Sequence, residues 1–145
     1  MKKFIVLTAV FFMGVFFAQE PIKNLSKEDI PIEVANLVDI STVTFMIDTE
    51  PSFPGGMSAF RKEFSQNFDT SALEKTDGGT LKTVVYYVVE VDGSILYVKA
   101  IGENESFNKE AERTLKSIKT KYAPAKVNNL VVRHILRMPL SMNFK

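Results

Sequence analysis

The chain has 145 residues, of which 46% are hydrophobic and 24% charged, and this composition is typical of one globular domain. Its formal charge of +1 argues against nucleic acid as a partner, because phosphate binding needs a concentrated basic surface. There is no cysteine and one histidine, which excludes disulfides, thiolate metal sites, a cysteine nucleophile and a histidine-rich metal site. We therefore expect no metal and no small-molecule cofactor.

The first segment, MKKFIVLTAVFFMGVFFAQE, has the three parts of an export signal: two lysines, an apolar run from Phe4 to Ala18, and a polar residue. An apolar run of this length is shorter than the roughly 20 residues that cross a bilayer core, so cleavage is favoured over a retained anchor. We expect residues 1–18 to be a signal peptide, cut between Ala18 and Gln19, although Phe16 is bulkier than the residue usual before such a cut. Without the signal segment, which carries Lys2 and Lys3, the chain has 16 basic and 17 acidic residues.

Residues 19–46 are expected to form a linker or N-terminal extension, because their short apolar clusters lack a sustained period. One strand is expected within this part of the chain, at Thr42–Ile47. The remaining residues, 47–145, are expected to form the domain.

The stretch PSFPGGMSAFRKEF predicts a helix after two glycines. Its apolar residues recur at helical spacing and should share the buried face: Met57, Phe60, Phe64 and Phe68. We interpret Phe53, Pro54, Gly55 and Gly56 as a sharp turn that tucks the phenylalanine against the helix. A phosphate-binding role for these glycines, or for the DGG stretch at 77–79, is disfavoured because neither has the strand, spacing and helix of a phosphate loop.

The strongest strand signal is TVVYYVVEVDGSILYVKAIG. Asp92 and Gly93 separate two β-branched and aromatic runs, which predicts a hairpin whose two central residues both take positive φ. Apolar residues occupy both alternating sets of Val84–Val91, so this strand should be covered on both faces or lie at the sheet centre. The return strand is expected at Ser94–Ile101.

A second helix is expected in NESFNKEAERTLKSIKTKYAP, capped by Ser106 or Asn108 and stopped by Pro124. Its apolar stripe comprises Phe107, Ala111, Leu115, Ile118 and Tyr122.

The last stretch, LVVRHILRMPLSMNF, alternates as a half-buried strand does. One face carries Val132, His134, Leu136, Met138, Leu140, Met142 and Phe144, and the other carries Arg133, Ile135, Arg137 and Ser141. Pro139 cannot donate to a ladder, so the strand should lie at a sheet edge. The single histidine falls in the apolar phase, where we expect a packed, hydrogen-bonded imidazole and not a general base. Since no nucleophile elbow or metal-ligand spacing accompanies it, we expect no enzyme.

Together these elements predict an α+β fold in which two helices pack on a small antiparallel three-stranded sheet. The first hairpin strand should be central and the C-terminal strand should form an edge. Such an edge can pair with another strand.

The ordered motifs PSFPGG, VVYYVVEVDGSILYVKAIG, NKEAERTLKSI and YAPAKVNNLVVRHILRMPLSMNF resemble the C-terminal domain of TonB, in the variant common in exported proteins of Bacteroidota. The resemblance covers about Ile47 to Phe144. Two positions depart from it: Tyr122, before Pro124, stands where relatives usually have tryptophan, and Asn129 stands where an Asn-Gly turn is usual. Tyrosine keeps the aromatic packing and asparagine accepts left-handed backbone, so the fold expectation is unchanged.

The resemblance implies a periplasmic module that binds a peptide or strand of an outer-membrane transporter, or of another envelope protein, by β-strand addition in TonB-dependent transport. Backbone hydrogen bonds provide such binding, so an available edge matters more than particular side chains. The expected edge is Val131–Ser141, with these partner-binding residues: Val131, Val132, Arg133, His134, Ile135, Leu136 and Arg137. The two arginines would steer an acidic partner or, as the favoured reading, keep the edge soluble.

The alternative is a short membrane-anchored energy transducer of the TonB type, whose N-terminal helix is not cleaved. It is disfavoured because about thirty linker residues span at most roughly 100 Å and include only two prolines. A homodimer formed through the same edge is also left open.

Overall fold

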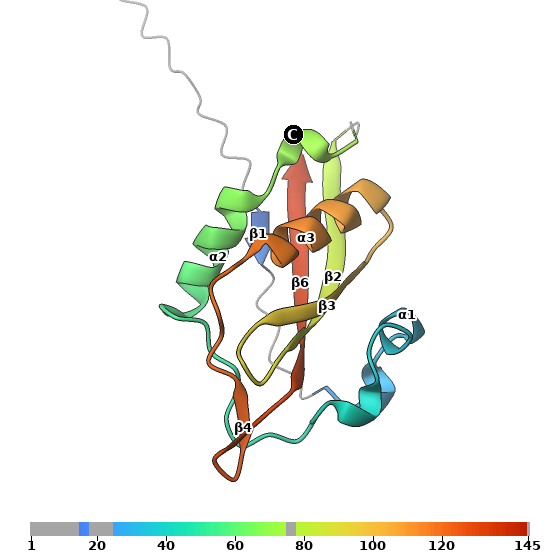
Figure 1. Cartoon of the computed structure of the whole chain (residues 1–145). Helices are drawn as coiled ribbons and strands as arrows, with labels where there is room; N and C mark the ends of the chain where they lie inside the picture. Colours follow the sequence, from blue (N-terminus) through green and yellow to red (C-terminus); the bar gives the residue numbers. More distant parts are fainter. Residues whose placement is uncertain (1–14, 18–24, 75–77, 145) are drawn as a thin grey trace, which may run out of the picture.

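The computed structural model describes residues 15–17, 25–74 and 78–144, so the expected cleavage site between Ala18 and Gln19 lies outside the described residues. The elements in chain order (Figure 1) are β1 (Val15–Phe17), α1 (Ile32–Ala35), α2 (Gly56–Asn67), β2 (Gly79–Val89), β3 (Ile95–Ile101), α3 (Glu105–Ser117), β4 (Ala125–Val127), β5 (Leu130–Val132) and β6 (His134–Phe144). Three short 3-10 turns lie at Lys27–Asp29, Ile40–Thr42 and Thr70–Ala72. The predicted α+β class, with two long helices against a small antiparallel sheet, is confirmed.

The main sheet has the strand order β1-β6-β2-β3, and each neighbouring pair is antiparallel. The β2–β6 ladder runs from Gly79 opposite Phe144 to Val89 opposite His134, and β3 pairs with β2 on its other side. The first hairpin strand is therefore central, as predicted. The C-terminal strand is the outer one of the three long strands, but the prediction that it forms the sheet edge is wrong at Leu140–Met142, where β1 adds a short fourth strand.

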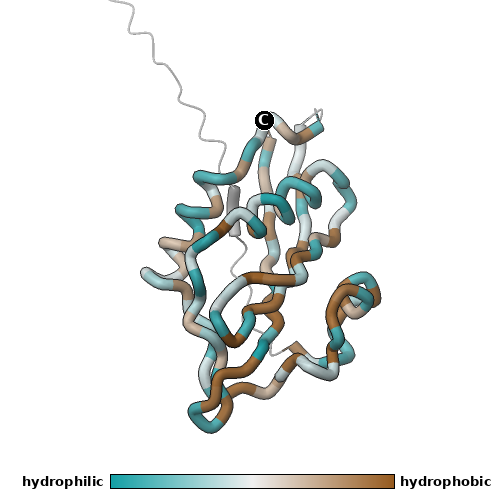
Figure 2. The backbone as a smooth tube through the Cα atoms, in the orientation of Figure 1, coloured by the Kyte–Doolittle hydropathy of each residue, from teal (hydrophilic) through white to brown (hydrophobic). Residues whose placement is uncertain are grey.

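Alternating residues of β2 enter two separate hydrophobic clusters, one on each face of the sheet. Val85 and Val89 belong to the cluster under α2 and α3. Tyr86 and Val88 belong to the cluster under residues 25–45, the N-terminal segment. Figure 2 shows hydrophobic stretches along the sheet strands and again around α1. The prediction that this strand is covered on both faces is confirmed.

Residues 25–45, expected as a linker or extension, form the cover of the second sheet face. Val34, Val38 and Val43 are buried there against Tyr86 and Ile135. The strand expected at Thr42–Ile47 is wrong, because residues 40–42 form a 3-10 turn and residues 43–47 join no strand. Burial of isolated valines against a sheet needs no strand or helix period, so the local pattern gave no signal for it.

We predict that Val34→Ala lowers the free energy of unfolding by about 1.5–2 kcal/mol, because it removes buried methyl groups from a fully enclosed site. Urea unfolding followed by circular dichroism would measure the change. The control is Ile32→Ala in the same short helix, where the side chain is 67% exposed and little loss is expected. Equal midpoints for Val34→Ala and the unmodified chain would contradict packing of this segment.

The PSFPGG stretch forms a type II turn that starts α2. The Gly56 N–H donates to the Phe53 carbonyl at 2.8 Å, and Gly55 has φ 82° and ψ 2°, the geometry that favours glycine at the third turn position. Phe53 is buried and meets the rings of Phe60 and Tyr122 edge-on, with centroids 5.3 and 5.2 Å away. The architectural interpretation of the two glycines is confirmed.

The predicted buried faces of the two long helices are confirmed except at Met57. Phe60 and Phe64 are fully buried, but Met57 is 49% exposed because it lies in the first turn of α2, beside the exposed glycine turn. In α3 the stripe Phe107, Ala111 and Leu115 is buried as expected.

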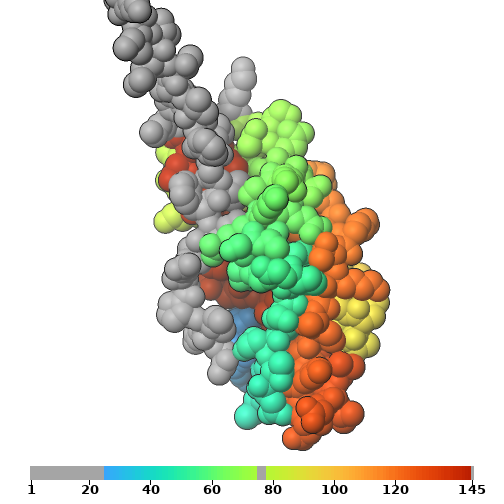
Figure 3. Space-filling view, turned by 90° about the vertical axis from the view of Figure 1, so that its left-hand side faces the viewer, coloured from blue at the N-terminus to red at the C-terminus, as the bar shows by residue number. Residues whose placement is uncertain are grey.

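The ends of α3 differ from the prediction. Asn104 caps the helix, accepting from the Phe107 N–H at 2.8 Å, so the expected caps at Ser106 and Asn108 are wrong. The helix ends at Ser117, well before Pro124, because the chain then turns to bury Tyr122, whose hydroxyl lies 2.9 Å from that of Tyr87. The residues that follow α3 run beside those that precede α2, joined by bridges Ser52–Ala123 and Thr49–Lys126, and Figure 3 shows these two segments side by side.

The β2–β3 hairpin has a three-residue loop and not the predicted two-residue turn. The Glu90 N–H donates to Ser94, the Gly93 N–H donates back to Glu90, and only Gly93 of the central pair has positive φ, at 84°. Asp92 instead accepts hydrogen bonds from the backbone N–H and hydroxyl of Ser94, at 2.9 and 2.6 Å. Glycine is favoured at position 93 because this position of the loop requires a positive φ, which glycine adopts without steric cost.

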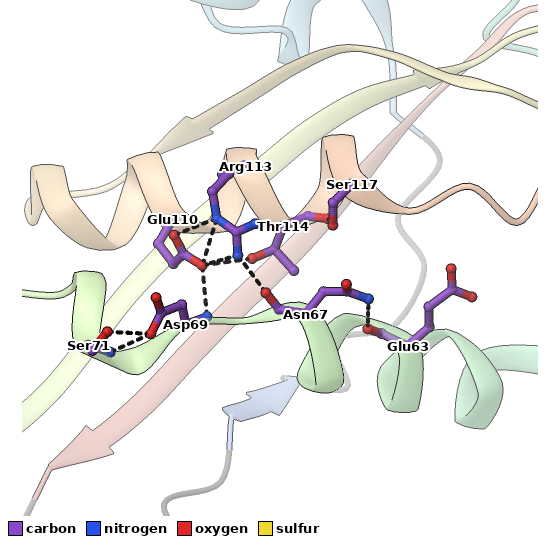
Figure 4. A network of polar contacts seen from close by, with 8 residues as sticks. All are labelled: Glu63, Asn67, Asp69, Ser71, Glu110, Arg113, Thr114 and Ser117. Atoms are coloured by element: carbon purple, nitrogen blue, oxygen red, sulfur yellow. Dashed lines mark hydrogen bonds and ion pairs between the residues drawn. The ribbon is translucent and has the colours of Figure 1, made fainter.

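A buried carboxylate joins α3 to the loop after α2 (Figure 4). Glu110 is 4% exposed and accepts from Arg113, from the backbone N–H of Asp69 at 2.8 Å, and from Thr114. Burial alone would raise the pKa of Glu110, but these hydrogen bonds and the Arg113 charge outweigh it and hold the pKa below its usual value.

Glu110→Gln is predicted to destabilise the protein by about 1–3 kcal/mol at pH 7. A carboxyl whose pKa is lowered on folding stabilises the protein above its unfolded pKa, and this contribution disappears as pH falls through the folded pKa. The difference between wild type and Glu110→Gln should therefore shrink in urea titrations taken from pH 7 to pH 3. Glu105→Gln, which breaks an exposed ion pair with Lys109 on the same helix, should show little effect.

Candidate partner-binding edge

The residues expected to bind a partner do not lie on one continuous strand. Val131 and Val132 belong to β5, which pairs with β4 in a separate two-stranded sheet. Between these strands Asn128 and Asn129 both have positive φ, at 50° and 63°, as a two-residue hairpin turn requires. The chain then turns at Arg133 into β6. The continuous alternation of residues 130–144 predicted one strand and gave no sign of this corner.

Arg133 is held by groups of its own chain. Its guanidinium makes two hydrogen bonds of 2.9 Å to the Glu90 carboxylate, contacts the Thr42 hydroxyl, and lies 5.5 Å from the ring centroid of Tyr97. The hydrogen bonding that Arg133 donates to the Glu90 carboxylate is the main reason that the pKa of Arg133 is raised. This guanidinium is thus engaged within the domain and does not project as an isolated positive charge.

Tyr97 owes its position to an irregularity in β3. The β2–β3 register shifts between Tyr86 and Val88, and Tyr97 has φ 54°, a left-handed conformation that aromatic residues rarely adopt. Such a β-bulge re-aims a side chain, and here it brings the tyrosine ring over Arg133.

His134 fastens the N-terminal segment to the start of β6. It is 7% exposed, and its Nδ1–H donates to the Thr44 carbonyl at 2.7 Å, while the Thr44 N–H donates to the Arg133 carbonyl at 2.9 Å. The expectation of a packed, hydrogen-bonded histidine is confirmed. The carbonyl partner requires the tautomer with hydrogen on Nδ1.

The remaining expected residues lie in the first half of β6. Ile135 is fully buried under the N-terminal segment, Leu136 is half-buried against the helix-side cluster, and Arg137 is exposed. Their side chains therefore point to both faces of the sheet, and the feature that they share is the strand backbone.

The outer side of β6 pairs with a strand from the start of the chain. β1 lies antiparallel to it, with Val15 opposite Met142, Phe16 opposite Ser141 and Phe17 opposite Leu140. The pairing thus lies at the end of the expected edge Val131–Ser141 and beyond the seven residues that were expected to bind a partner. It was missed because residues 15–17 were assigned to the export signal, whose apolar pattern predicts no strand partner.

Pro139 fits this arrangement. Proline has no N–H to donate. The ladder between β6 and β2 therefore stays complete when the proline nitrogen faces away from β2, toward the outer side of the strand. Ser141, two residues on, faces the same side by strand alternation, and it is the middle residue of the pairing with β1.

A hollow lies beside the N-terminal half of α3, lined in part by Glu74, Glu105 and Lys109. Its charges are largely matched, because Glu105 pairs with Lys109 at 2.7 Å and Glu110 pairs with Arg113. Among the residues that the structure describes, no acidic or histidine side chains gather in a group that could hold a metal ion, and no helix has the length and apolarity to span a bilayer.

Comparison of the chain with protein-family models, with curated proteins and with solved structures finds no match.

Proposed function

We propose that the protein is an exported binding module of the periplasm that recognises an extended segment of an outer-membrane transporter, or of another envelope protein, by adding it to the outer side of β6. The observation that carries the proposal is the pairing of β1 with β6, because it shows that this edge accepts an antiparallel strand. Strand addition uses backbone hydrogen bonds, which agrees with the mixed orientation of the β6 side chains.

Two further features support this function. The edge belongs to a sheet that is packed on both faces, so its backbone is already ordered and binding adds little ordering cost on the side of the domain. The sequence motifs that resemble the TonB C-terminal domain include the turn at Gly55 and the loop at Gly93, both of which have positive φ in the structure. The choice of an outer-membrane transporter as the partner rests on the sequence resemblance.

The test is site-specific photocrosslinking in the native cells. A benzophenone amino acid replaces Asn143, an exposed residue of β6, and in a control protein it replaces Lys62 on α2, which is also exposed. We expect the Asn143 protein alone to crosslink to an extended segment of an envelope protein, and we expect Ser141→Pro to abolish the product. Crosslinks of equal yield at both positions, or products that survive Ser141→Pro, would overturn strand addition at β6.

The same cells decide between the module and the membrane-anchored transducer. The protein is recovered from the soluble periplasm and from membranes, and its intact mass and N-terminal sequence are determined. A chain that starts at Gln19 in the soluble fraction supports the module. A chain that retains Phe4–Ala18 in the inner membrane supports the transducer.

A further inference from the structure

We propose that β1 occupies the partner-binding edge of its own domain, so that removal of the residues that form β1 opens the edge. This inference rests on the proposed function, because it concerns the same side of β6. It assigns a regulatory role to residues that the sequence marks only as an export signal.

The geometry of the pairing carries the inference. β1 is the outermost strand of the sheet and lies antiparallel to β6 at Leu140–Met142, where a foreign strand would add in the same orientation. An edge pairs with one strand at a time, because each outward N–H donates to one ladder partner and each outward C=O accepts from one. β1 and an external strand are therefore mutually exclusive at these residues.

The chemistry of β1 also describes the external strand that would replace it. The sequence Val-Phe-Phe is uncharged, β-branched and aromatic, which are the residue types that favour a strand. We therefore infer that the partner segment is an extended, uncharged peptide rich in such residues that runs antiparallel to β6.

Tethering makes the internal strand an effective competitor. A strand joined to its site by a short linker acts at an effective concentration of about 1 mM. If a free peptide of the same sequence binds the open edge with a Kd of about 100 µM, the tethered copy weakens binding of that peptide about tenfold.

The first experiment tests the pairing itself in the full chain. Phe16→Cys with Ser141→Cys places two thiols directly opposite each other, at the Cα separation that disulfides require, in a chain that has no other cysteine. The matched control is Phe16→Cys with Lys82→Cys, because Lys82 lies opposite Ser141 on the other side and is roughly 9–10 Å from β1. We expect a disulfide under mild oxidation in the first protein alone. Equal yields, or no disulfide in either protein, would overturn the inference.

The second experiment measures occlusion with a fluorescent synthetic peptide of residues 12–20 as the probe. A chain that begins at Gln19 keeps both hydrophobic clusters, since their buried residues lie between residues 34 and 142, and circular dichroism checks its fold. Fluorescence anisotropy should show about tenfold tighter binding to this chain than to the reduced full chain, and no binding to the oxidised Phe16→Cys, Ser141→Cys chain. Equal affinity for the full and shortened chains, or no binding to either, would overturn the inference.

The two proposals fail in different ways. Equal binding of the probe to both chains would remove self-occlusion but leave strand addition at β6 intact. Efficient disulfide formation together with no envelope crosslinks at Asn143 in cells would leave the internal pairing intact and remove the proposed partner.

Discussion

Gly93→Ala is expected to lower the free energy of unfolding by roughly 2–5 kcal/mol, from left-handed strain of about 1–2 kcal/mol together with a steric clash of about 1–3 kcal/mol. A Cβ at this position would lie 2.0 Å from the carbonyl oxygen of Tyr122, and the backbone φ is 84°. The Tyr122 backbone cannot retreat easily, because its N–H donates to the Gly93 carbonyl at 2.9 Å. Urea unfolding monitored by circular dichroism would measure the loss.

Gly56→Ala is the matched control for strain without a clash. Its φ is 79°, close to that of Gly93, but a Cβ there would meet no atom within 4 Å. We expect a loss of about 1–2 kcal/mol from the left-handed backbone alone. If the two alanine variants lost the same stability, close approach of the Tyr122 carbonyl would have no energetic role.

Phe60→Ala is expected to cost about 3–5 kcal/mol, because the ring is fully buried between Phe53, Phe64 and Tyr122. Its removal leaves a cavity in the cluster that joins α2 to the sheet. The shift in the urea midpoint, at unchanged slope, gives the magnitude.

Met57→Ala tests the same helical stripe one turn earlier. The side chain is 49% exposed, so we expect a loss of no more than about 0.5 kcal/mol. A large loss for Met57→Ala would mean that the first turn of α2 is packed in solution, as the sequence period alone predicted.

Local pattern predicted those elements whose side chains repeat with one period. The alternation in Leu136, Met138 and Leu140 marked β6, and the spacing of Phe60 and Phe64 marked α2, because each set faces one continuous cluster. The central position of β2 also followed, since apolar residues in both phases require cover on two faces.

Tertiary contacts decided the features that pattern could not predict. Val34 and Val38 are buried by the sheet, which local sequence does not contain. Tyr122 is buried in the same cluster as the α3 stripe although the helix has ended at Ser117. The corner at Arg133 depends on its ion pair with Glu90, a residue distant in sequence. For the candidate edge, the pattern placed β6 correctly but could not reveal the pairing with β1, because the apolar run that contains β1 is equally typical of a secreted leader.

The position of β2 in the sheet constrains the time course of folding. Its longest ladder is with β6, the last element along the chain, which pairs Gly79 with Phe144. During N-to-C synthesis of the chain, β2 and β3 can close their local hairpin early, but one edge of β2 lacks its partner until β6 has been made. Completion of the fold is thus a late event, and during that interval the nascent chain is exposed to intermolecular strand pairing and benefits from chaperone protection.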